Sequence, residues 1–516
     1  MIAKSVQDRW IALAVGVFFL GYTYLWIYKS GFGEADSAGI AVGIHQAVLH
    51  GQGLAEPLLY LPLGHPLYYL ILLHWPGAAS LDSVISTMNH LSWLSMGGTF
   101  ALAYLICRRF ARPAWALAAL IAVASSPLAF EVATYGHPVT PALFLFMVGA
   151  VALLSASERG FLVDARGVGL VALTTLAVGA SICTRADSVF FLPALVALAH
   201  AVRRERRSVF AAGLTVVLAM MIYIVARKIV PPVGPNHGNA IHDLINFVAT
   251  FYKPRLLGTG VAWFWLVIGP GLGLAIVAAV VGLLRRRSWM TLFHGLCLMG
   301  PTFLFFVGNP HPSRHFLHVI VGAAFFLAMA GEQLQPVKQP RIATLVPLVI
   351  ALNLGLFPLF GAVAHAAGWE PAHVSEKGSW LSVRLTQSVF QQHLTNQRFR
   401  AWDHARWERI FAKGPEGDLM IGGWVDHTGL LMYSSGRDLR ILRSDKVSAA
   451  GVRYLDFLID GVGFHFWEWY PGDPAKSPVS YPPEVIILYP YSTADLAQLP
   501  RGTMDASEWR ALHTTL

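Results

Sequence analysis

Charge is scarce in this sequence, since only 13% of its 516 residues are charged, whereas soluble domains carry about 25%. Hydrophobic residues make up 55% of the chain, and the mean hydropathy is +0.53. This composition excludes an ordinary soluble domain and predicts a polytopic membrane protein. The net charge of +9 does not indicate nucleic-acid binding, because many basic residues stand in short clusters between apolar runs.

Cysteine and several catalytic signatures are also missing or rare. The three cysteines, Cys107, Cys183 and Cys297, lie in or beside apolar segments, so no disulfide framework is expected in the polar C-terminal part. The chain has no P-loop, Rossmann fingerprint, nucleophile elbow or His-Glu-x-x-His zinc motif. The glycine-rich stretch 269–273 lies within an apolar run, which favours a packing site or a kink over a phosphate loop.

Long apolar runs dominate what remains. The first is too long for a signal-peptide core and is predicted to be a retained helix. A shorter run at 67–75 predicts an interfacial helix. With the N-terminus inside, the pattern predicts 11 transmembrane spans, at about 10–28, 84–106, 115–130, 140–154, 167–183, 188–201, 209–226, 261–284, 291–307, 316–330 and 342–363.

Basic residues orient these spans. Sixteen Lys and Arg residues fall in the predicted cytoplasmic segments and seven in the outer loops before residue 364, as the positive-inside rule requires. The predicted fold is an α-helical polytopic membrane protein of the cytoplasmic (inner) membrane. Residues 1–363 form its transmembrane domain, with a first outer loop at 30–83, and residues 364–516 form a small extracytoplasmic α/β domain.

The C-terminal part is more polar and reads as mixed structure. A polar helix is expected at 380–411, and short apolar runs at 419–424, 440–443 and 485–488 predict strands. We expect a further helix around 449–458. Trp467, Trp469 and Tyr470 are expected in a loop that touches lipid or sugar.

The first outer loop holds two acids, Glu34 and Asp36, and no Lys or Arg occurs between Lys29 and Arg108. A carboxylate pair at the membrane surface can act as a general base, a metal ligand or a polar-substrate clamp. The alternative is a pair of solvated acids, with Asp36 or Ser37 capping a helix. That helix, over 36–51, is predicted from the four-residue spacing of its apolar positions and would lie in the interface.

Several cations and polar residues on the predicted outer side are candidates for substrate binding: Arg314, Arg185, Lys253, Arg255, His65, Tyr135 and His137. A guanidinium binds phosphate through two parallel hydrogen bonds, which suits Arg314 and Arg185 to a phosphate clamp. Each candidate also has a plainer interpretation. Arg314 can anchor a helix at the interface, Arg185 can pair locally with Asp187, and Lys253 and Arg255 can attract headgroups.

These motifs, taken in order, resemble the GT-C superfamily of membrane glycosyltransferases, in the subgroup of protein mannosyltransferases and aminoarabinose transferases. The family's acidic motif of the first outer loop appears as Glu34-Ala-Asp36, and the start of its next segment as Pro66-Leu-Tyr-Tyr69. The later motifs appear as Arg185-Ala-Asp187, Arg314-His-Phe-Leu317 and Tyr433-Ser-Ser-Gly-Arg437. Where family members often carry an acid in the second outer loop, this chain has Tyr135, His137 and Thr140.

The resemblance implies an enzyme that transfers a sugar from a polyprenyl-phosphate donor to an acceptor hydroxyl, with inversion, on the outer face of the membrane. Asp36 would be the general base and Glu34 would orient the acceptor or Asp36. A divalent cation, Mg or Mn, would be held by these two acids if one is used. The expected partners are the lipid-linked donor, a glycan, lipid or protein acceptor, and membrane lipids, but no nucleic acid.

Two other classes stay open. A transporter or lipid flippase predicts ionisable residues at mid-membrane depth, whereas the charges here cluster at the ends of the spans. An O-antigen polymerase or ligase-like enzyme also fits outer loops rich in Arg and His. Its donor would be a whole oligosaccharide on pyrophosphate, so a donor-swap assay separates it.

Overall fold

The structure is a computed structural model that divides into two compact units. The helical unit comprises Met1–Tyr28, Leu63–Ile71 and Thr87–Ala367, and the second unit comprises Lys29–Pro62, Leu72–Ser86 and Gly368–Leu516. The structure describes residues 6–27, 66–77, 80–133, 136–159, 165–229, 268–307, 316–334 and 348–353, five strands between 419 and 488, and single positions between 37 and 48 and at 261 and 264.

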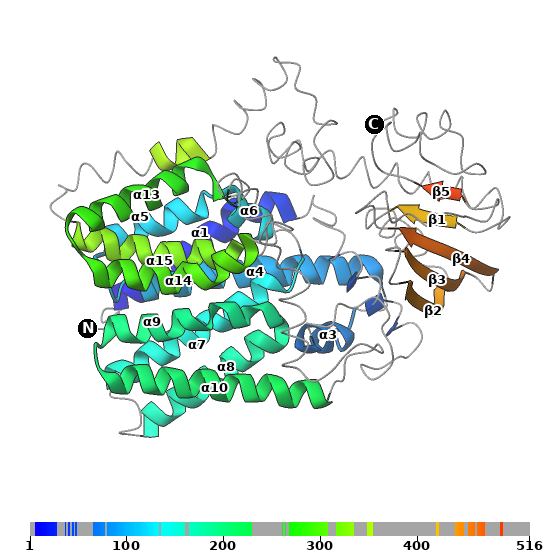
Figure 1. Cartoon of the computed structure of the whole chain (residues 1–516), viewed down its shortest axis with the longest axis horizontal. Coiled ribbons are helices and arrows are strands. Elements are labelled where there is room, and N and C mark those ends of the chain that lie inside the picture. Colours follow the sequence, from blue (N-terminus) through cyan, green and yellow to red (C-terminus); the bar gives the residue numbers. More distant parts are fainter. Residues whose placement is uncertain are drawn as a thin grey trace, which may run out of the picture. The chain divides into compact units, whose positions relative to one another are not determined.

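Helices make up the first unit, and Figure 1 shows many of them running alongside one another. α7 packs on α8, α8 on α10, α9 on α14, and α14 on α15. The bounds are α1 (Val6–Ile27), α3 (Pro66–Leu73), α4 (Leu81–Cys107), α5 (Pro113–Ala124), α6 (Pro127–Ala133), α7 (Val139–Arg159), α8 (Ala165–Thr184), the 3₁₀ helix η1 (Ala186–Phe191), α9 (Leu192–Val202), α10 (Arg206–Ile229), α13 (Pro270–Arg285), α14 (Trp289–Val307) and α15 (Leu317–Gln333).

The apolar runs of the sequence form these helices, which confirms the predicted class of helical membrane protein. Within the described residues, five helices are long and apolar enough to cross a membrane, namely α4, α7, α8, α10 and α14. α7 is an inner helix, with 72% of its apolar window buried, whereas 22% is buried in α10. The exposed apolar side chains of α10 suit contact with lipid. The total of 11 spans stays a prediction, because parts of the chain lie outside the described residues.

Two predicted spans are interrupted by proline. The single helix expected over 115–130 was wrong, since α5 ends at Ala124 and α6 begins at Pro127. Pro127 cannot donate a backbone hydrogen bond, and it disfavours a helical conformation at the residue before it. The helix expected over 261–284 is likewise broken at Gly269, whose φ of 89° suits glycine, and α13 starts at Pro270. The predicted kink in this glycine-rich stretch is confirmed.

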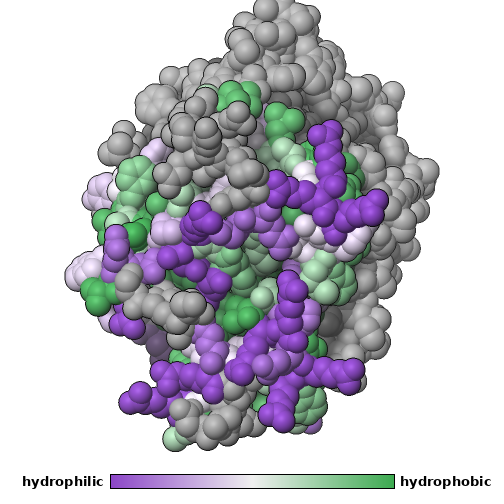
Figure 2. Space-filling view, turned by 90° about the vertical axis from the view of Figure 1, so that its left-hand side faces the viewer, coloured by the Kyte–Doolittle hydropathy of each residue, from purple (hydrophilic) through white to green (hydrophobic). Residues whose placement is uncertain are grey.

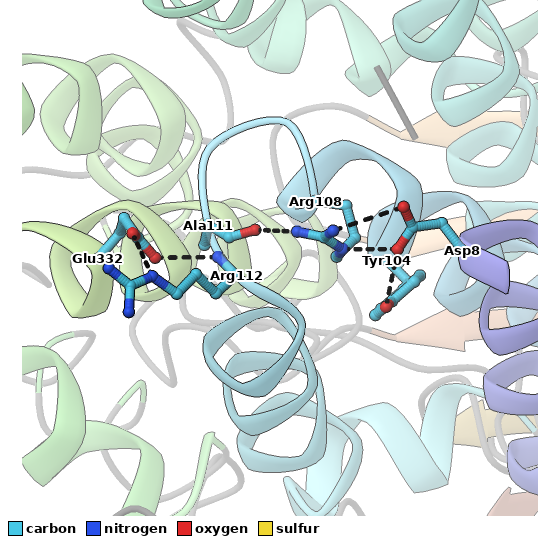
Figure 3. Close-up of polar contacts among 6 residues, drawn as sticks. All are labelled: Asp8, Tyr104, Arg108, Ala111, Arg112 and Glu332. Atoms are coloured by element: carbon cyan, nitrogen blue, oxygen red, sulfur yellow. Dashed lines mark hydrogen bonds and ion pairs between the residues drawn. The ribbon is translucent and has the colours of Figure 1, made fainter. Parts of the chain in front are cut away.

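One end of the helical unit is held by ion pairs between helices (Figure 3). Arg108, just after α4, donates from Nε to Asp8 of α1 over 2.7 Å, and the Tyr104 hydroxyl donates to the same carboxylate over 3.4 Å. Arg112 contacts Glu332 of α15 through both its backbone nitrogen, at 2.9 Å, and its Nε, at 3.1 Å. These contacts join the first and last described long helices of the unit at the end where the basic clusters lie.

Hydrophilic residues cover much of this end of the molecule, as Figure 2 shows. The turns 203–207 and 285–287 belong to it, and most of their arginines are exposed. A third ion pair, between Arg109 Nη1 and Glu158 Oε1 at 2.6 Å, is nearly buried and links α4 to α7. By the positive-inside rule, this arginine-rich end is expected to face the cytoplasm.

The second unit contains a five-stranded mixed sheet, drawn in orange and red in Figure 1. The strand order is β2-β3-β4-β1-β5, in which β2, β3 and β4 are antiparallel and β1 runs parallel to both β4 and β5. The strands are β1 (Leu419–Gly422), β2 (Leu439–Val447), β3 (Val452–Ile459), β4 (Val462–Trp469) and β5 (Ile486–Leu488).

The strands predicted at 419–424, 440–443 and 485–488 are confirmed, with somewhat different ends. The helix expected around 449–458 was wrong, because β3 occupies most of it. Trp467 and Trp469 were expected in a loop and instead belong to β4, while Tyr470 lies outside the described residues. Both segments are rich in Val, Phe, Tyr and Trp, which favour strands, and β3 pairs on both sides. The helix expected at 380–411 and the predicted domain boundary at 363/364 also lie outside the residues that the structure describes.

The interfacial helix predicted over 36–51 is described at single positions only. Each of these positions is helical, and Ile40 and Ile44 are fully buried, which agrees with the predicted apolar face. The run 67–75 forms the helix α3, and its place in the membrane interface stays a prediction.

Candidate functional site

Arg185 lies at the corner where α8 ends and η1 begins. Its backbone is extended, with φ −156° and ψ 112°, which turns the chain between the two helices. Its Nε donates to the carboxylate of Asp187 over 2.6 Å. Both side chains are buried, at 5% and 7% exposure. The local ion pair foreseen in the sequence is therefore present, and it is sealed from bulk solvent.

His137, on the turn before α7, is the second partner of Arg185. The Nη1 of Arg185 lies 3.2 Å from Nδ1 and 3.1 Å from Nε2 of the imidazole. The backbone N–H of Val139 also donates to Nδ1, over 3.2 Å. Because a backbone amide can only donate, Nδ1 of His137 is the acceptor of the Val139 N–H. The imidazole is thereby oriented with both ring nitrogens close to the guanidinium.

The turn that carries His137 is held by α3 and α4. Gly136 has a φ of 61°, and its carbonyl accepts from the hydroxyl of Tyr68 over 3.2 Å. Ser92 of α4 donates to the carbonyl of His137 over 3.1 Å. Burial raises the pKa of Tyr68 well above its ordinary value, so this phenol remains a hydrogen-bond donor. Groups from two other helices therefore fix the backbone beside the site.

His318, on the first turn of α15, completes the cluster. Its ring meets that of Phe191 edge-on, with centroids 5.3 Å apart, and it lies within electrostatic reach of Asp187 and Arg185. The side chain is 2% exposed, and its Nε2 has no hydrogen-bond partner among the described residues. We call His137, Arg185, Asp187 and His318 the outer cluster.

Two buried hydroxyls beside the outer cluster are also without a partner among the described residues, Thr184 Oγ1 and Ser188 Oγ. Buried polar atoms in folded proteins are normally hydrogen-bonded to protein or to ordered water. Three such atoms around one corner of the chain, counting His318 Nε2, indicate a place where water or a polar ligand group is accommodated.

The outer cluster lies at the end of the helical unit opposite to the arginine-rich end. α8 runs from the basic segment near Arg166 to Thr184, and its 20 residues span about 30 Å. α7 and α15 each start at the cluster and run to Arg159 and to Glu332, near the other end. The distance is comparable to the thickness of a membrane core, so the cluster is expected on the outer side.

The structure brings together two of the residues predicted for the site, Arg185 and His137. The other seven lie outside the described residues: Glu34, Asp36, His65, Tyr135, Lys253, Arg255 and Arg314. No three His, Cys, Asp or Glu side chains gather as a metal site would require in the part of the chain that is described. The possible metal ligands, Glu34 and Asp36, are not in that part.

Sequence reasoning gave no role to His318, Tyr68 or Ser92. His318 carried a usable signal, because an ionisable side chain inside an apolar run is costly in a membrane and therefore suggests a function. Tyr68 stands in the Pro66-Leu-Tyr-Tyr69 motif but was not singled out. Ser92 has no distinguishing neighbourhood in the sequence, and only the packing of α4 against the turn before α7 identifies it.

Chemically, the outer cluster offers a fixed guanidinium with an imidazole beside it. Asp187 holds one edge of the guanidinium and so sets its direction. A preoriented arginine is suited to anionic oxygens, and phosphate is a ligand that its planar fork matches. Low exposure strengthens such an interaction, because it takes place away from bulk water.

Comparison with known proteins gives structural likenesses only. No protein-family model matches the sequence, and no curated protein matches it either. The chain is similar to the crystal structure of ArnT from Cupriavidus metallidurans, with 17% identity and a TM-score of 0.48, over 83% of this chain and 85% of that one.

The chain is also similar to archaeal oligosaccharyltransferase structures from Archaeoglobus fulgidus. AglB in complex with an inhibitory peptide and a dolichol-phosphate aligns at 11% identity and a TM-score of 0.43, over 83% of this chain and 64% of that one. The enzyme tethered to an acceptor peptide with an NVT sequon aligns at 12% identity and a TM-score of 0.44, over 84% and 63%. The chain thus spans a little under two thirds of these oligosaccharyltransferases.

Proposed function

We propose that the protein is a membrane glycosyltransferase that transfers a sugar from a polyprenyl-phosphate donor to an acceptor hydroxyl on the outer face of the cytoplasmic membrane. The observation that carries this proposal is the outer cluster, in which a buried guanidinium is held by Asp187 and faces His137. It lies in the Arg-x-Asp motif that contributes to the resemblance, at the end of the helices away from the arginine-rich end.

The leaving group of this reaction is a lipid phosphate, on which negative charge develops as the glycosidic bond breaks. Cations stabilise that charge most where water is excluded, which is the setting of Arg185. Arg314, Lys253 and Arg255 are proposed as further cations around the phosphate. His65, Tyr135 and His137 are proposed to bind polar groups of the substrates.

The acceptor hydroxyl must lose a proton as it attacks the anomeric carbon from the face opposite to the phosphate, which inverts the configuration. Asp36 is proposed as the general base, a role worth about 10²–10⁴-fold in rate. Glu34 is proposed to orient the acceptor. If Mg or Mn takes part, these two carboxylates are the proposed ligands.

The direct test is sugar transfer by the purified protein from a panel of synthetic polyprenyl-phosphate sugars. We expect transfer from at least one monophosphate donor and none from oligosaccharides linked through pyrophosphate. Transfer from the pyrophosphate donors alone would favour the polymerase or ligase class. Movement of lipid-linked sugar across vesicles without any transfer would favour a flippase.

The general base is tested by Asp36→Asn, which keeps the size and the helix-capping ability of the side chain but removes the proton acceptor. We expect turnover to fall by about 10²-fold or more with unchanged folding and donor binding. As a cap alone, Asn is about as good as Asp, so activity would hardly change. Glu34→Gln is the matched control and should lower turnover less.

A further inference from the structure

Two arginine-rich turns lie at the end of the helical unit opposite to the outer cluster. The connection between α9 and α10, together with the start of α10, carries Arg203, Arg204, Arg206 and Arg207, and three arginines at 285–287 stand at the end of α13 and in the turn before α14. Two of these seven have structural partners. Arg203 donates to Glu205 and to the carbonyl of Ser157, and Arg286 donates to the carbonyl of Gln333. The other five are the arginine cluster: Arg204, Arg206, Arg207, Arg285 and Arg287.

A contact between two histidines brings the turns together. His200 Nδ1 of α9 lies 2.9 Å from His294 Nε2 of α14, and Arg204 is close enough to act on His294 electrostatically. His200 is three residues from the first turn, and His294 is five residues from the start of α14. At 1.5 Å per helical residue, each turn begins within about 10 Å of the histidine pair. The arginine cluster is therefore carried by two neighbouring segments at one end of the helical unit, although they are distant in the chain.

The members of the arginine cluster are exposed and have no ion-pair or hydrogen-bond partner among the described residues. Arg287 also has a backbone φ of 54°, which residues other than glycine rarely adopt. By contrast, Arg108 and Arg109, at the same end of the unit, form ion pairs with Asp8 and Glu158. Glu205, the acid of the first segment, is bound by Arg203, and topology needs only an excess of positive charge, so it does not explain five guanidinium groups without an acid partner among the described residues.

Large apolar side chains border the arginine cluster. Trp289 and Met290, which follow Arg287 after one serine, are 63% and 43% exposed, and Phe210 on the second turn of α10 is 74% exposed. Tryptophan beside a basic cluster is typical of the level of a bilayer where acyl chains meet headgroups. The cluster is thus expected at the depth of lipid phosphates, rather than out in the aqueous phase.

We propose that the arginine cluster binds the phosphate headgroup of an anionic phospholipid in the inner leaflet. The planar guanidinium donates two parallel hydrogen bonds to phosphate, and two turns with five such groups can surround one headgroup. Trp289 and Phe210 would lie along its acyl chains. The site does not depend on the proposed transfer reaction, and it is separated from the outer cluster by the length of α8.

The test measures retention of lipid by native mass spectrometry of the purified full chain, with dioleoyl-phosphatidylglycerol against dioleoyl-phosphatidylcholine. We expect the wild type to retain the anionic lipid preferentially. The triple variant Arg204→Gln, Arg206→Gln, Arg207→Gln should weaken this retention by about fivefold per arginine, on the order of 100-fold in total. The triple Lys variant keeps the charge but loses the fork, so it should fall between the two.

The matched control removes three positive charges elsewhere, as Arg9→Gln, Arg166→Gln, Lys228→Gln, all of which are exposed in the structure. It should retain lipid as the wild type does. Equal losses in both triple variants would reduce the effect to net charge and overturn the site, as would unchanged retention in the cluster variant. Displacement of the lipid by millimolar inorganic phosphate would make it a soluble-anion site instead. Gel filtration and unfolding in phosphatidylcholine verify that each variant is folded.

Discussion

The side chain of Arg185 has a structural role, in its ion pair with Asp187, and a proposed chemical role, in binding the donor phosphate. Its ion pair with Asp187 is almost completely buried, so each charge depends on the other. Loss of one member of a buried pair commonly costs about 3–5 kcal/mol, whereas replacement of both by apolar residues is often neutral or stabilising. This asymmetry separates the two duties.

We predict that Arg185→Met lowers both the melting temperature in detergent and the transfer activity. The double variant Arg185→Met, Asp187→Leu should recover most of the stability, because no buried charge is left alone, but it should remain inactive. A double variant that regains both stability and activity would make the pair purely structural. Thermal unfolding and the polyprenyl-phosphate transfer assay, run on the same preparations, give the two readouts.

The pairing of Arg185 with Asp187 could be predicted from the sequence because the residues are two positions apart. The contact with His137 could not, since it joins segments 48 positions apart and depends on how α7 packs against α8. His318 comes from a still more distant helix. Local spacing therefore identifies the ion pair, and only the tertiary packing shows that His137 contacts its guanidinium and that His318 lies within electrostatic reach of both charges.

Among the elements, the turn between α6 and α7 has the strictest backbone requirement. Gly136 has a φ of 61°, and a Cβ there would lie 2.6 Å from the side-chain oxygen of Asn89. We predict that Gly136→Ala destabilises the protein by about 1–2 kcal/mol or more and displaces His137, with a loss of activity. Circular dichroism melting and the transfer assay measure the two effects.

Gly169→Ala is the control for this prediction. Gly169 lies in α8 and has nothing within 4 Å of its would-be Cβ. Since alanine favours a helix over glycine by about 1 kcal/mol, this change should leave activity intact and stability equal or higher. If Gly136→Ala behaved in the same way, the turn would not control the position of His137.

Asn353 fastens the end of α5 to the start of α13. Its Oδ1 accepts from the backbone of Leu272 over 3.0 Å, and its Nδ2 donates to Ala122 O over 3.2 Å and to Ser125 Oγ over 2.9 Å. We predict that Asn353→Leu costs about 3 kcal/mol, because it leaves buried polar groups unsatisfied. Asn353→Asp should destabilise the protein less than Asn353→Leu does, at a pH where the new carboxyl is protonated. In that form the side chain keeps a carbonyl acceptor and one O–H donor. Equal stability of Asn353→Leu and the wild type would contradict this role.

Helix positions were predictable because apolar runs of sufficient length have few other stable forms in a membrane. The positions at which helices are interrupted were harder to predict. Pro127 and Pro270 are visible in the sequence, yet a transmembrane helix can also accommodate proline as a kink. Whether the chain breaks depends on local partners such as Ser125 and Asn353. β3 was misread because its apolar residues also fit a helical spacing, and pairing with β2 and β4 decides in favour of a strand.

For the whole molecule, the predicted topology is the assumption that most of the functional reasoning shares. Reporter fusions after residues 112, 207 and 287 should report the cytoplasmic side, and fusions after 240 and 364 the outer side. The reason is the excess of basic residues at one end of the helices. If a fusion after 364 were cytoplasmic, the outer cluster would face the wrong compartment for a lipid-linked donor, and the proposed reaction would fail with it.

The separation of only two positions between Arg185 and Asp187 also affects how the protein enters the membrane during synthesis. An arginine or an aspartate costs about 2.5–3.5 kcal/mol at the centre of the bilayer, a depth that the turn of an inserting hairpin has to pass on its way to the outer side. Here both charges belong to one helical hairpin, α8–η1–α9, and lie 2.6 Å apart. The hairpin can therefore leave the translocon with its charges already neutralised, without waiting for α15. His318, which is synthesised much later, would join a pair that the bilayer has already accepted.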